Sequence, residues 1–259
     1  MTFNIDLNSD LGESFGAYKI GLDEEVVPLI TSANAACGYH AGDPTVMKKT
    51  IILAKEFKVA VGAHIGFPDL LGFGRRNMEV TYDEIRDYAT YQIGALAAFA
   101  ARFGVALQHV KPHGALYNMA VADGTIWEVI AEVMARIDNR LILYAMAGNN
   151  ASELKKMGQK YGVRIALEFF ADRAYNPDGS LVSRRLPGAV IHDHDLAAKR
   201  VVRMVKEGLL AGIDGKDLKI QAETVCVHGD NPEAVTLVRT IRTALSRAGV
   251  NVVSAGTFI

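Results

Sequence analysis

Cysteine is scarce in this sequence: only Cys37 and Cys226 occur in 259 residues. Two cysteines cannot build the disulfide framework of a small secreted domain, so we expect both thiols to be reduced. The sequence also lacks a run of about 18 apolar residues, which a membrane-spanning helix requires. Its first residues, MTFNIDLNSDLGE, have neither the basic nor the apolar region of a signal peptide. We therefore predict a cytoplasmic protein that does not bind a membrane.

An excess of charge of one sign is missing too. Lys and Arg number 28 and Asp and Glu number 29, which leaves a net charge of −1. This balance gives no electrostatic reason to expect nucleic acid as a partner. Hydrophobic residues make up 50% of the chain, so we expect a packed core. Because no Ser/Pro-rich linker, low-complexity tract or charge block divides the sequence, we predict a single domain over residues 1–259.

The sequence does contain a regular alternation of short apolar runs, polar loops and amphipathic segments. Runs rich in Val, Ile and Leu predict seven strands, over residues 3–7, 30–35, 59–65, 107–111, 141–146, 164–169 and 224–228. Capping residues predict helix starts at Asp43–Pro44, at Thr81 with Glu84, at Asn150, at Asp193 or Asp195, and at Asn231–Pro232. We expect the second of these helices to end near Arg102 and the fourth to end near Leu210.

This alternation predicts a parallel sheet covered by helices, which is either a closed barrel or an open doubly wound sheet. Ionisable side chains follow every predicted strand except the fifth. In a parallel barrel these strand ends share one face, whereas an open sheet concentrates its site at one switch point. We therefore predict an α/β fold, namely a seven-stranded parallel β/α barrel of the TIM type.

The polar side chains at these strand ends are predicted to meet around one pocket. The candidates for catalysis are Asp6, Asn8, Asp10, His40, His64, Lys111, His113 and His228. The candidates for substrate binding are Asn34, Cys37, Tyr117, Glu168, Asp172, Arg173 and Asp230. A pocket so rich in carboxylates and imidazoles suits hydrolysis of a small polar molecule by acid–base or metal-assisted chemistry. Spacing along the sequence does not show whether these groups converge on a divalent metal.

The two most polar stretches near the N-terminus each have a structural alternative. Asp6, Asn8 and Asp10 would share one face if the first strand continued to Asp10, or they would cap a turn. In SANAACGYHAGDP, Cys37 and His40 fit a nucleophile with its base, or a buried thiol beside a polar loop. One Cys and one His do not supply the four ligands of a zinc finger.

Later stretches leave similar alternatives open. Lys111 would polarise a carbonyl group or stabilise an oxyanion, or it would pair with a carboxylate for structure. Asp230 equally fits a helix cap. The Gly-rich stretch VGAHIGFPDLLGFGRR, over residues 61–76, lacks the GxxxxGK[ST] order of a phosphate-binding P-loop. It is more typical of a mobile lid or rim.

Motifs spread over nearly the whole chain resemble the lactam-utilisation (LamB/YcsF) family. They are DLNSDLGESFG, SANAACGYHAGDP, GAHIGFPDLLGFGRR, VKPHGALYN, EFFADRAYNPDGSLVSR and VHGDNP, in the expected order. The resemblance implies a seven-stranded β/α barrel similar to polysaccharide deacetylases and related glycoside hydrolases. The family supplies the A subunit of the prokaryotic ATP-dependent 5-oxoprolinase. The implied reaction is the opening of the lactam of 5-oxo-L-proline to L-glutamate, together with subunits B and C.

In that reaction, Asp10 or a neighbouring carboxylate would orient or deprotonate water, with His40 and His64 transferring protons. Lys111 or Arg173 would bind the anionic carboxylate or phosphate oxygens. ATP would bind to the partner subunits or to a pocket that is not a P-loop. The alternative is a metal-dependent deacetylase or amidohydrolase that acts on a small polar or carbohydrate substrate without ATP. A binding protein without turnover is a further alternative, and assembly into a homo-oligomer is left open.

Overall fold

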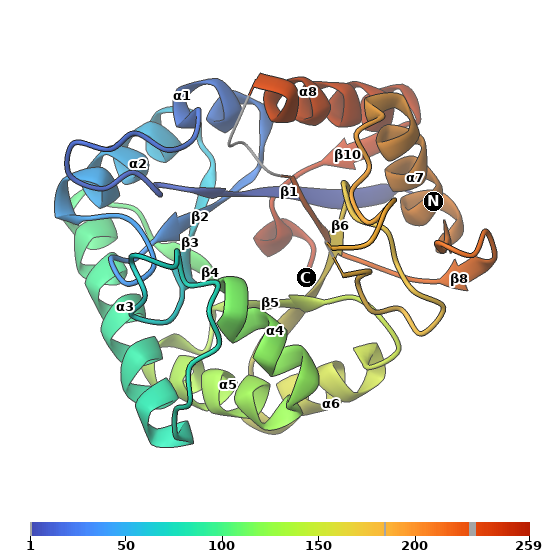
Figure 1. The fold of residues 1–259 in the computed structure, drawn as a ribbon. Helices are drawn as coiled ribbons and strands as arrows, with labels where there is room; N and C mark the ends of the chain where they lie inside the picture. The colour runs from blue at the N-terminus through green and yellow to red at the C-terminus, as the bar shows by residue number, and fades with distance from the viewer. Residues whose placement is uncertain (1, 184, 228–231) are drawn as a thin grey trace.

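The computed structural model describes residues 2–183, 185–227 and 232–259, and it shows a closed parallel β-barrel surrounded by helices (Figure 1). The seven barrel strands are β1 (Phe3–Leu11), β2 (Ser32–Ala36), β3 (Ala60–Ile65), β4 (Leu107–Pro112), β5 (Ile142–Met146), β6 (Arg164–Phe170) and β9 (Thr224–Cys226). The ring closes because β1 pairs in parallel with both β2 and β9. The predicted seven-stranded barrel is therefore confirmed.

Strand β1 is the longest of the barrel strands and has three partners. Its first residues pair with β10 (Val250–Val252), its middle pairs with β9 and its last residues pair with β2. The predicted strand stopped at residue 7, but the ladder continues to Leu11. Successive side chains of a strand point to opposite faces, so Asp6, Asn8 and Asp10 all point to the same side. Their hydrogen-bond partners on β2, β4 and β9 show that this side is the barrel interior.

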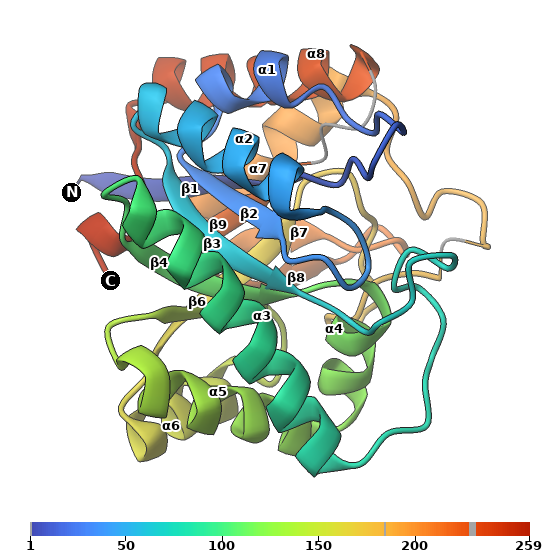
Figure 2. The same ribbon diagram turned by 90° about the vertical axis from the view of Figure 1, so that its left-hand side faces the viewer.

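Helices cover the outside of the barrel, as Figures 1 and 2 show. They are α1 (Asp23–Val26), α2 (Pro44–Glu56), α3 (Tyr82–Arg102), α4 (Gly114–Ala122), α5 (Gly124–Asp138), α6 (Ala151–Tyr161), α7 (His194–Glu207) and α8 (Pro232–Arg247), with the 3₁₀ turns η1 (Val27–Leu29) and η2 (Ala255–Thr257). Among the described helices, none combines the length and the apolarity that crossing a bilayer requires. Both chain termini lie at the end of the barrel opposite the long loops (Figure 2).

Asp43, Thr81 and Asp193 begin their helices for the expected physical reasons, whereas Asn150 precedes α6 without a side-chain cap hydrogen bond. Asn231, predicted to begin the last helix, lies outside the described residues. The Asp43 carboxylate accepts hydrogen bonds from the N–H groups of Thr45 and Val46, two donors that a helix start leaves without partners. Thr81 and Glu84 form a complete capping box at the start of α3. These contacts fix where each helix leaves its strand-end loop, and so they fix the loops that carry the polar residues.

The predicted end of α7 is wrong, and two small strand features were not predicted. Gly208 adopts a left-handed conformation with φ 66° and ends α7 after Glu207, so the helix does not reach Leu210. The chain then forms β7 (Leu209–Ala211), which pairs antiparallel with β8 (Asp217–Lys219). Strand β10, near the C-terminus, was also missed. Runs of three residues are too short to show the alternation that identifies a strand.

Buried apolar side chains lie mainly outside the barrel wall, and buried polar side chains lie inside it. The outward faces of the strands pack apolar side chains such as Ile5, Leu7 and Val61 against the helices. The interior of the barrel instead buries polar side chains, among them Asp6, Asn8, Asn34, His109, Lys111, Glu168 and Thr224. Buried polar groups are costly unless they are hydrogen-bonded. The polar side chains of the interior must therefore form an ordered hydrogen-bond network. This network extends toward the carboxyl ends of the strands, where the pocket lies.

Candidate functional site

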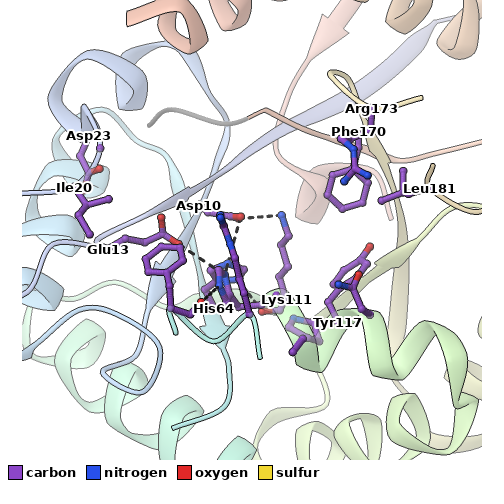
Figure 3. Close-up of a pocket in the computed structure, with 18 residues that line it drawn as sticks. Asp10, Glu13, Ile20, Asp23, His64, Lys111, Tyr117, Phe170, Arg173 and Leu181 are labelled. Carbon is purple, nitrogen blue, oxygen red and sulfur yellow. Dashed lines mark hydrogen bonds and ion pairs between the residues drawn. The ribbon is translucent and has the colours of Figure 1, made fainter. Parts of the chain in front are cut away.

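A pocket of about 470 Å³ opens at the carboxyl ends of the strands, and Figure 3 shows the side chains that line it. This is the face on which active sites of β/α barrels lie. The predicted site residues that line it are Asp10, His64, Lys111, His113, Tyr117 and Arg173. The structure thus brings together side chains from the ends of β1, β3, β4 and β6. The remaining predicted residues lie deeper, beside the pocket, or outside the described residues.

Asp6 lies at the bottom of the interior network and does not line the pocket. Its carboxylate accepts hydrogen bonds from the hydroxyl groups of Thr31, Ser32, Tyr144 and Thr224. Burial raises the pKa of Asp6 above its ordinary value, and these hydrogen bonds only partly oppose that effect. Asp6 and Asp10 therefore share one face of β1, as predicted, but only Asp10 reaches the pocket, and Asp6 is buried below it.

Asn8 and Asn34 form a layer between Asp6 and the pocket. Asn34 Nδ2 donates to Asn8 Oδ1 at 2.7 Å and to Asp10 Oδ1 at 2.8 Å. Asn34 Oδ1 accepts from His109 Nε2 at 2.7 Å. Neither asparagine lines the pocket, and both are fully buried. Their contacts hold the Asp10 carboxylate in one orientation, with its second oxygen turned toward His64 at 3.3 Å.

Lys111 is the buried cation of the site. Its Nζ lies 2.9 Å from Asp10 Oδ1 (Figure 3). The same nitrogen lies 2.9 Å from Glu168 Oε1 and 3.2 Å from Cys226 Sγ. Burial lowers the pKa of Lys111, but attraction to Asp10, Cys226 and Glu168 outweighs it and holds the pKa well above its usual range. Lys111 therefore stays charged at the pocket wall, and the structural pairing predicted as an alternative is present.

Tyr117 and Glu168 extend this ion pair along the wall. The Tyr117 hydroxyl donates to Glu168 Oε2 at 2.9 Å, so both carboxylate oxygens of Glu168 face donors. Arg173 lines the pocket, and its guanidinium donates to the carbonyl oxygens of Val182 and Ala189. These two bonds tie together the loop that follows β6. Asp172, the neighbour of Arg173, is not among the side chains that line the pocket.

Three histidines at the ends of three different strands lie against one another beside Asp10: His40 follows β2, His64 is near the end of β3, and His113 follows β4. The rings of His40 and His113 are stacked with centroids 3.8 Å apart, and the ring of His64 is nearly perpendicular to both. Burial, followed by repulsion from neighbouring imidazoles, lowers the pKa of His113 to about 3 and that of His40 well below 6.5. Both rings are therefore neutral in the structure near neutral pH. A neutral imidazole has one ring nitrogen with a free lone pair, which can accept a hydrogen bond or bind a metal ion.

Cys37 does not reach the pocket. Its thiol is buried and donates to the carbonyl oxygen of Ala35 at 3.2 Å. Burial raises the pKa of Cys37 to about 12, so the thiol carries almost no thiolate near neutral pH. Since a cysteine nucleophile reacts as the thiolate, the structure favours the buried thiol that was the alternative to a nucleophile here. His228 and Asp230 lie outside the described residues.

Several residues of the site were not among the sequence candidates, including the polar lining residues Asp23, Arg75 and Asn118. Glu13 lines the pocket, and its Oε1 lies 3.7 Å from His40 Nε2 and 3.8 Å from His113 Nδ1. Phe73 lines the pocket and accepts a hydrogen bond from His113 on its carbonyl oxygen. Cys226 contacts Lys111. Glu13 had a signal, because it continues the acidic run DLNSDLGE, but the other two contacts depend on the three-dimensional fold alone.

Comparisons with known proteins agree on one family. The model of the LamB/YcsF family matches residues 5–259. Proteins named as the A subunit of 5-oxoprolinase, from Alkaliphilus metalliredigens and Thermococcus onnurineus, are 57% and 56% identical, with 97% and 98% of this chain and 97% and 99% of theirs covered. The crystal structure of a lactam utilization protein from Thermus thermophilus is 44% identical with a TM-score of 0.91, covering 97% of this chain and 99% of that one.

Proposed function

The chain belongs to the LamB/YcsF family, and we propose that it is the A subunit of a 5-oxoprolinase that opens 5-oxo-L-proline to L-glutamate. The observation that carries this proposal is similarity over nearly the full length to proteins that bear this subunit's name. The site is consistent with hydrolysis, because carboxylates, imidazoles and one buried ammonium surround a pocket of small-molecule size.

Lactam opening makes four chemical demands on the site. The amide carbonyl must be activated, water must attack it, a base must take a proton, and the carboxylate of the substrate must be held. In the proposed arrangement, Asp10 orients the attacking water, because one of its oxygens is fixed by Lys111 and Asn34 while the other faces His64. The positive charges of Lys111 and Arg173 at the wall favour binding of the anionic oxygens.

ATP supplies the carbonyl activation in this proposal. Phosphorylation of the lactam oxygen by ATP, with release of ADP, converts a stable amide into a reactive imidate. Water then adds to the imidate carbon, and the C–N bond of the ring breaks as the nitrogen takes a proton. Hydrolysis of the resulting acyl phosphate releases glutamate and inorganic phosphate. The sequence has no GxxxxGK[ST] motif, so in this proposal ATP binds to partner subunits B and C or to a pocket of this chain that is not a P-loop. The relatives are named as one subunit of an enzyme, which supports a complex. With ATP on the partners, the open face of the barrel around the pocket is the side on which they deliver the activated substrate.

The direct test measures glutamate released from 5-oxoproline by this chain, with and without its partner subunits and with and without ATP. We expect release only when the chain, both partners and ATP are all present. In the complete complex, Asp10→Asn and His64→Ala are expected to reduce turnover by at least about a hundredfold, the usual contribution of a positioned acid or base. Release by the chain alone without ATP would instead support the metal-dependent amidohydrolase, and near-normal turnover of both variants would remove the assigned roles.

A further inference from the structure

His64 and His113 each have one ring nitrogen committed to a backbone carbonyl group. His64 Nδ1 lies 3.0 Å from the carbonyl oxygen of Lys111, and His113 Nε2 lies 2.8 Å from that of Phe73. A carbonyl oxygen only accepts hydrogen bonds, so both of these nitrogens carry hydrogen. The nitrogens on the opposite sides of the two rings are His64 Nε2 and His113 Nδ1, which are the positions that bind a metal ion when they carry no hydrogen.

These two nitrogens lie 3.0 Å apart, which is hydrogen-bond distance if one of them carries a hydrogen. If both carry lone pairs, they repel each other unless a cation lies between them. Carboxylate oxygens surround the same point, since Asp10 Oδ2 lies 3.3 Å from His64 Nε2 and Glu13 Oε1 lies 3.8 Å from His113 Nδ1. Two ligands that each lie about 2.1 Å from one metal ion are separated by roughly 3.0–3.4 Å. The distance between the two histidine nitrogens and the distance from His64 Nε2 to Asp10 Oδ2 both lie in that range.

We propose that His64, His113, Asp10 and Glu13 bind one divalent transition-metal ion. Each histidine donates its far N–H to a backbone carbonyl, which is the outer contact that metal-bound histidines usually make and which fixes the ring for binding. Imidazole and carboxylate ligands together suit Zn²⁺ or Mn²⁺, whereas Mg²⁺ and Ca²⁺ prefer oxygen ligands alone. The metal site shares Asp10 and His64 with the proposed hydrolysis, in which both residues would act as ligands of the ion, but metal binding itself is measurable without the reaction.

His40 provides a second and independent observation at the same place. It is fully buried, yet neither of its ring nitrogens has a hydrogen-bond partner among the described residues. A buried polar group without a partner is rare and needs a reason. Its ring is parallel to that of His113 within 4°, so the two rings cannot direct in-plane lone pairs at one ion. His40 Nε2, which lies 3.7 Å from Glu13 Oε1, instead binds a water molecule held by the ion.

The charges of the cluster are consistent with a dication. Asp10, Glu13 and Glu168 bring three carboxylates, and Lys111 brings one ammonium. With the guanidinium of Arg75, which lines the same pocket, the group carries one net negative charge, and this charge attracts a divalent ion. Excess buried charge of one sign is costly in a medium of low dielectric constant. The ion also explains the orientation of the Asp10 carboxylate, whose Oδ1 accepts from Lys111 while Oδ2 faces His64.

Metal binding is measured on the full chain alone, without partners or substrate, so that its outcome is separate from that of the proposed reaction. The chain is stripped with a chelator and titrated with Zn²⁺, Mn²⁺ and Mg²⁺ by calorimetry, and Co²⁺ is added to record its visible absorption. We expect one equivalent of Zn²⁺ or Mn²⁺ per chain, no competition by Mg²⁺, and a Co²⁺ spectrum with imidazole ligands.

Glu13→Gln and His113→Asn are the test variants, and His192→Ala is the matched control at an exposed histidine. The two test variants are expected to bind Zn²⁺ at least about tenfold more weakly and to lose the Co²⁺ spectrum, whereas the control keeps both. Glu13→Gln keeps the size and shape of the side chain, and equal melting temperatures of the metal-free chains confirm that each variant folds. Less than half an equivalent bound by the unchanged chain, or undiminished affinity in both test variants, overturns the site.

Discussion

At the scale of single residues, the ion pairs inside the barrel bury charged groups, whose removal from water costs free energy unless each is paired. Lys111 is 2% exposed and lies between Asp10 and Glu168. Replacing it by methionine keeps the length of the side chain but leaves two carboxylates near each other without their cation. Removing one partner of a buried pair costs about 3–5 kcal/mol. We predict that Lys111→Met lowers the free energy of unfolding by this amount, as measured by urea denaturation.

A second substitution separates lost charge pairing from lost packing. If repulsion between the two carboxylates is the cause, adding Glu168→Gln to Lys111→Met restores more than half of the lost stability, because one negative charge is gone. Lys156→Ala, at an exposed position of α6, is the control and is expected to change stability by less than about 0.5 kcal/mol. A double variant no more stable than Lys111→Met would assign the loss to packing alone.

Asp6 gives a prediction about pH. Its pKa in the folded chain is raised from 3.8 by burial, so the folded state holds this proton more tightly than the unfolded state does. Its stabilising contribution is therefore complete below the unfolded pKa and is lost as pH rises through the folded pKa. Asn at this position stays neutral. We predict that Asp6→Asn gains stability relative to the natural chain as pH rises from about 4 to about 8.

Asp178 is a control, because its pKa is shifted in the direction opposite to that of Asp6. Hydrogen bonds from Ser180 lower the pKa of this exposed carboxyl group, so its contribution is present above the unfolded pKa and is lost in acid. Asp178→Asn should therefore lose stability relative to the natural chain as pH rises from about 2 to about 5, with little further change above that. Urea denaturation from about pH 2 to about pH 8 measures both trends. A stability difference between Asp6→Asn and the natural chain that does not change with pH would contradict the assignment for Asp6.

At the scale of elements, the starts of α2, α3, α6 and α7 were predicted from the sequence, whereas those of α1, α4 and α5 were not, and the end of α7 was placed wrongly. Asp43, Thr81 and Glu84 act through neighbouring residues, and such local contacts leave a pattern in the sequence. The end of α7 depends on whether Gly208 turns left-handed or continues the helix. Glycine permits both conformations, so the choice is made by the pairing of β7 with β8.

Two glycines test this account of helix ends. Gly208 has φ 66°, and a Cβ there would meet no atom closer than 3.7 Å, so Gly208→Ala introduces strain without a clash. We predict a loss of about 1–2 kcal/mol in the free energy of unfolding. Gly94 lies inside α3, and a Cβ there would meet no neighbouring atom within 4 Å, so Gly94→Ala is predicted to stabilise by about 0.5–1 kcal/mol. Denaturant melts of both variants measure these opposite changes, and two changes of the same sign would refute the account.

At the scale of the whole molecule, the sequence predicted which strand ends carry chemistry but not how deep each side chain lies. Alternation shows that Asp6, Asn8 and Asp10 share a face, yet only the register between strands shows which of them reaches the pocket. The same limit explains Cys37, which is close in sequence to His40 but buried away from the pocket. It also explains Phe73, whose backbone carbonyl contributes a contact that no side-chain pattern records.

The two ends of the barrel have separate tasks, and this gives a final prediction. The pocket occupies the carboxyl ends of the strands, while Ala255 of η2 packs at the other end in an apolar cluster with Ile142, Tyr144 and Ala166. In a β/α barrel, stability is the role expected of that end, and catalysis is the role of the pocket end. Ala255→Asp places a carboxylate where the side chain is fully buried, and we predict a loss of more than about 2 kcal/mol of stability.

The turnover number of the reconstituted complex separates the two tasks. Measured well below the melting temperature, turnover per folded Ala255→Asp chain should equal that of the natural chain, because none of the four residues of this apolar cluster lines the pocket. Thr257→Asp, an exposed position two residues away, is the matched control and should leave both stability and turnover unchanged. A fall in turnover per folded chain for Ala255→Asp alone would show that the floor of the barrel sets the geometry of the pocket, through the column of buried polar residues that joins them.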